Sequence, residues 1–370
     1  MNKEKIISYI QLINTSCVGP INFKRLMERY HDVDKALSEL SQKRELFSRK
    51  KAEEELMKAE IKGIKIITLE DEYYPYNLRQ IEDCPPVLYA LGNIELLKNN
   101  NAIAVVGSRS ASFSASKMAK TLSAELSKSG ITIVSGMARG IDALSHEGAL
   151  SVGGNTIAVL GTGVDVVYPK ENEALYKEIS QKGLVLSDYP LGTKPQASNF
   201  PRRNRIVSGL SKGVLVIEAG IQSGSLITAN QALEQGRDVY AIPGAPLDGR
   251  ASGCNKLLKD GAILVEDAKD VLSSFCFTEK TFISTKSKKT KTPELFEYSL
   301  DNNKINSDIA NNIDYDSSSS LLSLLSDVGV DIDEVIRSMS IPAEDVLMQV
   351  MELELEGKII RLPGNKIAKA

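Results

Sequence analysis

The chain has 370 residues, which is enough for two or three domains rather than one small core. Its 45 lysines and arginines against 48 aspartates and glutamates give a net charge of −3, so contact with nucleic acid requires a local basic patch. Four scattered cysteines and two histidines disfavour a metal site and are typical of a reducing compartment. No apolar run reaches the roughly 18 residues that span a membrane, and the first residues lack the pattern of a signal peptide. We therefore expect a cytoplasmic protein with no membrane contact, no metal and no cofactor.

Residues 1–64 are expected to form a small helical domain. The stretch "GPINFKRLMERY" places Pro20 at a helix start, directly after Gly19. A glycine turn between two short helices is typical of a helix-hairpin-helix, which offers backbone N–H groups to a DNA phosphate. A helical bundle that only packs explains the same residues, and one Gly-Pro turn leaves both interpretations open.

Residues 65–276 follow a different pattern. Short apolar runs alternate with amphipathic segments such as Ala115–Ser129 and Glu173–Gln181. This alternation predicts a mainly parallel sheet covered on both faces, a Rossmann-like doubly wound α/β fold. The expected strands are Ile103–Val106, Ile131–Val134, Ile157–Leu160, Leu184–Leu186, Val214–Ile217 and Val239–Ile242.

Three of these strands end in glycine-rich loops, "VVGSRSAS", "VSGMARGID" and "VLGTGVD". Ligands of doubly wound sheets bind outside the carboxyl ends of the strands, and glycines there let backbone N–H groups approach an anion. None of the three is a G-x-G-x-x-G or a Walker A loop, and a single such turn is often explained by packing alone. Three of them at one sheet edge favour a phosphate-lined crevice.

The stretch "NFPRRNRIVSGLSK" places Arg202, Arg203 and Arg205 shortly after Phe200. The segment from "YPLGTK" to "GVLVI" holds five lysines or arginines and no carboxylate. A DNA single strand offers phosphates, which bind arginine forks, and unstacked bases, which stack on aromatic rings. The competing interpretations are ordinary solvated surface, a core position for Phe200, and an ion pair between Arg205 and a sheet carboxylate such as Glu218.

The C-terminal part is divided into a linker and a small domain. Residues 277–316 are rich in lysine, asparagine and serine, with little to bury, and are expected to be a flexible linker. Residues 317–370 contain two predicted helices, "DIDEVIRSMS" and "PAEDVLMQVMELELEG", and then a hairpin, which is the order of a winged helix. The second helix is expected to bury Val346, Leu347, Val350 and Leu353. Because it is acidic and phosphates repel it, we interpret the domain as a protein-interaction or packing module.

Several stretches occur in a fixed order between residues 66 and 272, including "YYPYNLRQIEDCPPVLYALGN", "VVGSRSAS", "IVSGMARGIDALSHEGAL", "FPRRNRIVSGLS" and "SGCNKLLKDGA". Together they resemble the DprA/Smf family of DNA-processing proteins. The resemblance implies a small helical domain, a Rossmann-like core and a winged-helix domain. It also implies a binding protein rather than an enzyme, because family members bind single-stranded DNA, form homodimers and load the RecA recombinase in natural transformation.

The resemblance places the single-stranded DNA site on the "GSR" loop, the "SGMARG" loop and the basic strip. The implied site residues are Gly107, Ser108, Arg109, Ser135, Gly136, Arg139, Gly140, Phe200, Arg202, Arg203 and Arg205. Arg109 is the hardest of them to explain by packing, since a long cation follows a glycine turn. Asp188 in "SDYP" departs mildly from the family, where Glu is usual. The dimer interface and the RecA contact are not assigned by the sequence.

Two other functions use a related fold. A nucleoside-monophosphate phosphoribohydrolase needs Pro-Gly-Gly-x-Gly-Thr-x-x-Glu, whose glutamate does acid–base work, and here Thr228 falls where that glutamate would stand. Asp142 and Glu218 lie near strand ends and are expected to orient loops. His146 is expected to be structural, bonded to Asp142 one helical turn away. A small-nucleotide sensor is the third interpretation that the glycine loops allow.

Overall fold

A computed structural model describes residues 2–280, 321–322, 325, 329–339, 342–362 and 366–370. The chain divides into two compact units, Met1–Leu272 and Ser273–Ala370, and each is described by itself. The predicted linker lies outside the described residues, apart from residues 277–280, which end helix α12 (Ala268–Lys280). No helix within the described ranges is long and apolar enough to cross a membrane.

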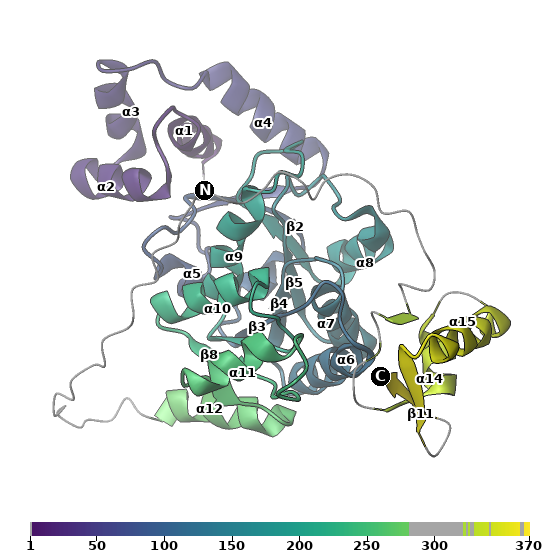
Figure 1. Cartoon of the computed structure of the whole chain (residues 1–370). Coiled ribbons are helices and arrows are strands. Elements are labelled where there is room, and N and C mark those ends of the chain that lie inside the picture. Colours follow the sequence, from purple (N-terminus) through teal and green to yellow (C-terminus); the bar gives the residue numbers. More distant parts are fainter. Residues whose placement is uncertain (1, 281–320, 323–324, 326–328, 340–341, 363–365) are drawn as a thin grey trace. The chain divides into compact units, whose positions relative to one another are not determined.

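The first unit is built on one sheet (Figure 1). Its strands are β1 (Lys65–Thr68), β2 (Val87–Gly92), β3 (Ala102–Val106), β4 (Thr132–Ser135), β5 (Thr156–Val159), β6 (Leu184–Ser187), β7 (Gly213–Val216), β8 (Asp238–Ala241) and β9 (Ile263–Leu264). They lie in the order β1-β2-β6-β5-β4-β3-β7-β8-β9. The strands from β6 to β9 in this order are parallel, whereas β2 is antiparallel to both of its neighbours.

The doubly wound α/β prediction is therefore confirmed. All six predicted strands are present within one or two residues, because each is a short apolar run that is buried on both sides of the sheet. Strand β9 was not predicted, because it has only two residues and both are exposed. The antiparallel addition of β1 and β2 was also not predicted, because pairing partners depend on contacts between distant segments.

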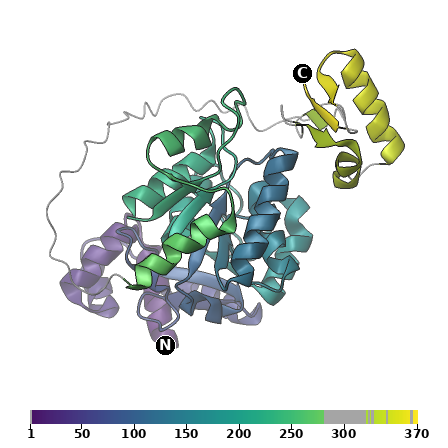
Figure 2. The same ribbon diagram turned by 90° about the horizontal axis from the view of Figure 1, so that it is seen from below.

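Helices cover both faces of the sheet. They are α5 (Tyr76–Arg79), η1 (Ile94–Lys98), α6 (Phe113–Lys128), α7 (Ile141–Ser151), η2 (Lys170–Asn172), α8 (Glu173–Lys182), α9 (Asn199–Gly209), α10 (Gly224–Glu234), α11 (Ser252–Lys259) and α12. Figure 2 shows the blue helices that follow β3 and β4 on one side of the sheet and the green helices that follow β7 and β8 on the other. The chain thus crosses from one face to the other between β6 and β7, at α9.

Four helices precede the sheet: α1 (Lys3–Ile13), α2 (Pro20–Tyr30), α3 (Val33–Ser41) and α4 (Arg49–Ile61). Their core includes the fully buried rings of Tyr9 and Phe23, whose centroids are 5.2 Å apart. As predicted, Pro20 begins α2, with Gly19 as its N-cap. A hydrogen bond connects these helices to the sheet domain: the backbone N–H of Leu191 donates to Glu55 Oε1 of α4 at 2.7 Å.

The second unit contains β10 (Val330–Asp331), α14 (Ile332–Ser338), α15 (Ala343–Leu355), β11 (Ile359–Leu362) and β12 (Lys366–Lys369). Its strands form a three-stranded sheet in the order β10-β12-β11, which confirms the winged-helix prediction and adds β10 to the hairpin. One core assignment was wrong. Leu347 is 41% exposed, and Gln349 is buried in its place, beside Val346, Val350 and Leu353.

Candidate functional site

The glycine-rich loops meet at one edge of the sheet. Strands β5, β4 and β3 are adjacent and parallel, so the loops after them all leave the same edge. The strand order reverses between β3 and β7, because the chain builds the sheet outward from β3 in one direction and then from β7 in the other. Such a reversal point is where doubly wound sheets bind their ligands.

Glu218, just after β7, holds the "GSR" loop in place. Its carbonyl oxygen accepts a hydrogen bond from the Ser108 N–H at 2.7 Å, and its carboxylate accepts one from the Ser112 N–H at 3.1 Å. A Cβ on Gly107 would lie 2.6 Å from Ile141 Cγ1, so only glycine fits this turn. Burial raises the pKa of Glu218, while the hydrogen bonds from Ser112 act in the opposite direction. The prediction that Glu218 orients a loop is confirmed.

Asp142 has the corresponding role for the "SGMARG" loop. Its Oδ2 accepts hydrogen bonds from the N–H groups of Gly136 at 3.1 Å and Ala138 at 3.3 Å. A Cβ on Gly140 would lie 2.3 Å from the Ser108 carbonyl oxygen, so the two loops are in close backbone contact. Ser135 is buried, and its hydroxyl donates to the Val105 carbonyl oxygen at 2.6 Å. Much of this loop's hydrogen-bonding capacity is therefore used within the protein.

Arg203 lies inside the protein, beneath these loops. It is 4% exposed, and its Nη1 donates to the carbonyl oxygens of Gly136 and, at 2.5 Å, Val159. A Cβ on Gly136 would stand 2.0 Å from that Nη1, so glycine is required for the arginine to fit. Burial lowers the pKa of Arg203, and the charge of Asp142 acts in the opposite direction. The guanidinium connects the ends of β4 and β5.

Arg205 is also buried, at 8% exposure. Its Nη2 pairs with Asp188 Oδ2 at 2.8 Å, and its Nε lies 3.4 Å from Asp83 Oδ2. The alternative that Arg205 pairs with a carboxylate at a strand end is thus confirmed, but its partner is Asp188, while Glu218 binds Ser112 instead. At about 100° per residue, Arg203 and Arg205 lie about 160° apart around α9, so their guanidinium groups reach different partners. Of the three arginines of α9, only Arg202 is exposed.

An exposed cation and two aromatic rings lie together at this edge. The Cζ of Arg109 is 5.9 Å from the centre of the Phe200 ring, and the Phe200 and Tyr168 rings are 5.5 Å apart. Phe200 is half-buried against Gly161, whereas Tyr168 is 43% exposed. Within the described residues, Arg109 forms no ion pair, while exposed Arg139 pairs with Glu171. Tyr168 was not predicted as a site residue, although "VVYPKEN" follows the third glycine loop directly.

His146 is structural, but its predicted partner was wrong. Its Nδ1 lies 2.6 Å from the hydroxyl of Thr156, which itself donates to the Ile133 carbonyl oxygen at 2.9 Å. The hydroxyl proton is thus used, and His146 Nδ1–H is the donor to Thr156. Complete burial lowers the pKa of His146 to about 3. Asp142 is occupied by the backbone of its own loop.

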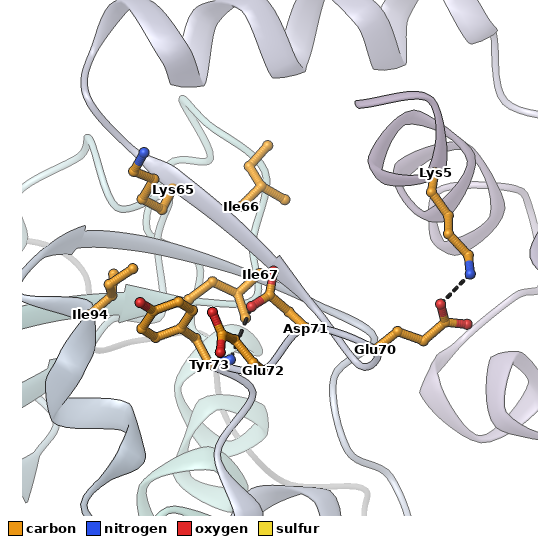
Figure 3. A pocket seen from close by; sticks show the side chains of 9 residues that line it. All are labelled: Lys5, Lys65, Ile66, Ile67, Glu70, Asp71, Glu72, Tyr73 and Ile94. Carbon is orange, nitrogen blue, oxygen red and sulfur yellow. Dashed lines mark hydrogen bonds and ion pairs between the residues drawn. The ribbon is translucent and has the colours of Figure 1, made fainter. Parts of the chain in front are cut away.

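A separate hollow of about 630 Å³ lies beside β1 (Figure 3). Lys5 of α1 and Glu70 form an ion pair on one side of it, and Tyr73 and Ile94 lie on its other side. Three consecutive carboxylates, from Glu70 to Glu72, line it, so it does not favour an anion. Strand β1 is five strand spacings from β3, roughly 24 Å. The hollow is therefore not part of the site at the β3–β7 edge.

Three family models match this chain, one in each predicted domain. Residues 65–276 match the family model described as DNA recombination-mediator protein A, which is more than half of the chain. Residues 3–62 match the DprA-like N-terminal HHH domain, and residues 313–365 match the DprA winged helix domain. The chain belongs to the DprA/Smf family.

Individual relatives of this DprA/Smf chain carry the names of the same family. The DNA processing protein DprA of Streptococcus pneumoniae is 44% identical over 264 residues, 71% of this chain and 85% of the relative. Protein Smf of Escherichia coli is 37% identical over 322 residues, 87% of this chain and 82% of the relative.

Two solved structures of the family share the fold. The X-ray structure of DprA from S. pneumoniae has a TM-score of 0.62 and 36% identity, covering 74% of this chain and 98% of its own. The DNA processing protein A of Helicobacter pylori, a structure concerned with its single-stranded DNA binding mode, has a TM-score of 0.53 and 31% identity. It covers 58% of this chain and 97% of its own.

Proposed function

We propose that this DprA/Smf chain binds single-stranded DNA at the β3–β7 edge of the sheet, without reading its sequence. The observation that carries the proposal is the position of Arg109. Its guanidinium is exposed, forms no ion pair within the described residues, and stands 5.9 Å from the ring of Phe200, which in turn lies beside Tyr168. The single-stranded DNA binding mode of the H. pylori relative supports the same ligand.

The chemistry of this cluster fits a single strand. Arg109 offers a planar fork of N–H donors for phosphate oxygens. Tyr168 and Phe200 offer ring faces on which any base stacks, because every base has a π face. Arg202, exposed on α9, adds a second cation for the backbone. Stacking and charge together give affinity without selecting a sequence.

The remaining predicted site residues act through the protein backbone in this proposal. Gly107, Gly136 and Gly140 allow the close contacts between the loops, and Ser108 and Ser135 fix them by hydrogen bonds. Arg203 and Arg205 are positioning residues, since both guanidinium groups are bonded inside the fold. Arg139 borders the site as part of an ion pair with Glu171.

Binding is favoured over hydrolysis by the state of the two carboxylates that hold the glycine loops. Asp142 and Glu218 are 7% exposed, and each accepts hydrogen bonds from backbone N–H groups of a loop. A general base must be within reach of the proton that it removes, and these two carboxylates are occupied. Thr228, in the place of the phosphoribohydrolase glutamate, is 2% exposed. We therefore propose a binding protein rather than an enzyme.

The family context extends the proposal. We infer that the chain acts as a homodimer in the cytoplasm, protects incoming single-stranded DNA and loads the RecA recombinase onto it during natural transformation. The support for this is membership of the recombination-mediator family. Light scattering of the free protein tests the homodimer, and a RecA filament-assembly assay on coated single strands tests the loading.

The binding proposal is tested with a labelled oligo-dT, its duplex form, and AMP and ADP as competitors. We expect tighter binding of the single strand than of the duplex and no displacement by either nucleotide. Arg109→Ala should lower the affinity about tenfold or more, in line with loss of a charge-assisted contact of roughly 1.5–3 kcal/mol. Arg79 is a matched control, because it is also exposed and lies 5.4 Å from a tyrosine ring, and Arg79→Ala should bind normally.

Three results would contradict the proposal. Unchanged binding by a folded Arg109→Ala protein would remove Arg109 from the site. Displacement of the oligonucleotide by AMP or ADP would identify a nucleotide sensor. Release of a free base from AMP would identify an enzyme.

A further inference from the structure

Helix α15 of the winged-helix unit has two apolar stripes. One of them forms part of the core and contains Val346, Val350 and Leu353, together with Gln349. The other is exposed. Its residues, which we term the outer stripe, are Leu347 at 41% exposure, Met348 at 59%, Met351 at 58% and Leu355 at 87%.

The outer stripe is continuous along the helix. At about 100° per residue, its four side chains fall within an arc of about 100°, and the buried residues occupy the opposite side. A helix at the surface of a soluble domain normally has polar side chains opposite its core stripe. Four large apolar side chains on that side of a single helix are typical of an interaction surface.

Acidic residues border the outer stripe. They are Glu344, Asp345, Glu352 and Glu354, and Glu356 follows as the C-cap, while Ala343–Leu355 contains no lysine or arginine. Glu354 is paired with Arg361 at 2.8 Å. Glu356 is paired with Lys358 at 2.7 Å. In the winged-helix part that the structure describes, Glu344, Asp345 and Glu352 form no ion pair.

The negative charge of α15 limits which kind of partner can bind the outer stripe. Nucleic acid and anionic lipid surfaces would both be repelled by this helix. A second copy of α15 would bring like charges together across the contact, which is also unfavourable. A helix with lysines or arginines beside an apolar stripe would match both the apolar residues and the carboxylates. Two of the four outer side chains are methionines, which adapt their shape to a partner surface.

We propose that the outer stripe of α15 is a docking surface for a partner protein that presents an apolar helix flanked by lysines or arginines. The winged-helix unit thereby recruits a protein and does not bind the DNA strand. The surface lies wholly on one helix, so the proposal is independent of the single-stranded DNA site.

The experiment uses the full-length protein and two synthetic helical peptides of about three heptads. Both carry leucine at the a and d positions. One has lysine at e and g, and the other has glutamate. Fluorescence anisotropy measures the affinity of each at low and at physiological salt. We expect the lysine peptide to bind about tenfold or more tightly than the glutamate peptide, a difference of about 1.4 kcal/mol.

Three variants assign the binding to the outer stripe. The double variant Leu347→Ser/Met351→Ser should lower the affinity for the lysine peptide about tenfold. Leu233→Ser, which removes an exposed leucine of α10 at 52% exposure, is the matched control and should have no effect. The reversal Asp345→Lys/Glu352→Lys should transfer the preference to the glutamate peptide. All affected side chains are exposed, so circular dichroism and melting should match the unmodified protein.

Other outcomes would overturn the proposal. Equal binding of the two peptides would show that charge does not select the partner. Unchanged binding by the Leu347→Ser/Met351→Ser protein would place the peptide elsewhere. Self-association that this variant abolishes would identify a second copy as the occupant.

Discussion

In helices α9 and α15, the exposure of the side chains is the opposite of what their residue types suggest. The sequence of α9 contains three arginines, yet two of them are buried and bonded to backbone oxygens or carboxylates. The sequence of α15 contains leucines and methionines typical of a core, yet four of them are exposed. The comparison shows that residue type does not report which side of a helix faces solvent. Position around the helix and the packing of neighbouring elements decide it.

The two regions also differ in buried charge. The sheet domain buries Asp142, Glu218, Arg203 and Arg205 next to its candidate site, and it also buries His146. In the described part of the winged-helix unit, Gln349 is the buried polar side chain, and no ionisable group is buried. The loops of the site are thus fixed by groups whose removal is costly, whereas α15 presents charges that are already solvated.

The largest expected effect is on Arg203. Arg203→Met should lower the free energy of unfolding by about 3 kcal/mol, because it leaves buried carbonyl groups and the charge of Asp142 without a partner. Arg202→Ala, on the exposed side of the same helix, should change it by less than about 0.5 kcal/mol. Urea denaturation measures both. Equal stability of the two variants would remove the distinction between buried and exposed arginines of α9.

Acidification should affect the sheet domain through His146. Its folded pKa of about 3 lies below the ordinary value of 6.5, so the unfolded chain binds a proton that the folded chain does not. This contribution to stability is complete above pH 6.5 and is lost as the pH falls toward 3. At pH 5 the loss is about 2 kcal/mol. Comparing the pH dependence of urea unfolding with that of His146→Gln isolates it, and identical slopes would contradict the assignment.

The next largest effect is expected from the aromatic rings, on the affinity for single-stranded DNA. Tyr168→Ala should weaken binding of oligo-dT by roughly 1–3 kcal/mol at every salt concentration, because stacking releases no counterion. Tyr168→Phe keeps the ring and should bind normally. Phe200→Ala should behave like Tyr168→Ala, provided that its melting temperature is unchanged. A Phe200→Ala protein whose binding follows only its folded fraction would show that this ring is part of the core.

The contribution of the exposed arginines should appear in the salt dependence of DNA binding. Arg109→Ala and Arg202→Ala should each reduce the slope of log K against log salt by about 0.7, since each lost phosphate contact releases one counterion fewer. Arg79→Ala and the tyrosine variants should keep the original slope. If neither arginine variant alters the slope, the arginines are ordinary solvated surface.

The smallest effect is expected from the winged-helix unit. Deletion of residues 278–370 should change the affinity for single-stranded DNA by no more than about fivefold, or about 1 kcal/mol. The reason is that α15 is acidic and repels phosphates. Titration of the shortened chain with oligo-dT checks this. A hundredfold loss would show that the unit binds DNA and would remove the contrast between α9 and α15.

The sequence alone determined the α/β class, the positions of six strands along the chain, the winged helix and the convergence of glycine loops at one edge. Apolar periodicity and glycine positions are local signals, and they survive folding because a buried strand needs an apolar run and a tight turn needs glycine. The loop-orienting roles of Asp142 and Glu218 were also predictable, since both follow closely after strand ends.

The tertiary structure alone decided which charges reach solvent. It placed Arg203 under Gly136 and paired Arg205 with Asp188, a residue 17 positions away. It brought Tyr168 beside Phe200 and turned Leu347 outward. Each of these outcomes depends on contacts between elements that are distant in sequence, and a long side chain such as arginine is driven inside only where carbonyl or carboxylate oxygens are already arranged to receive it.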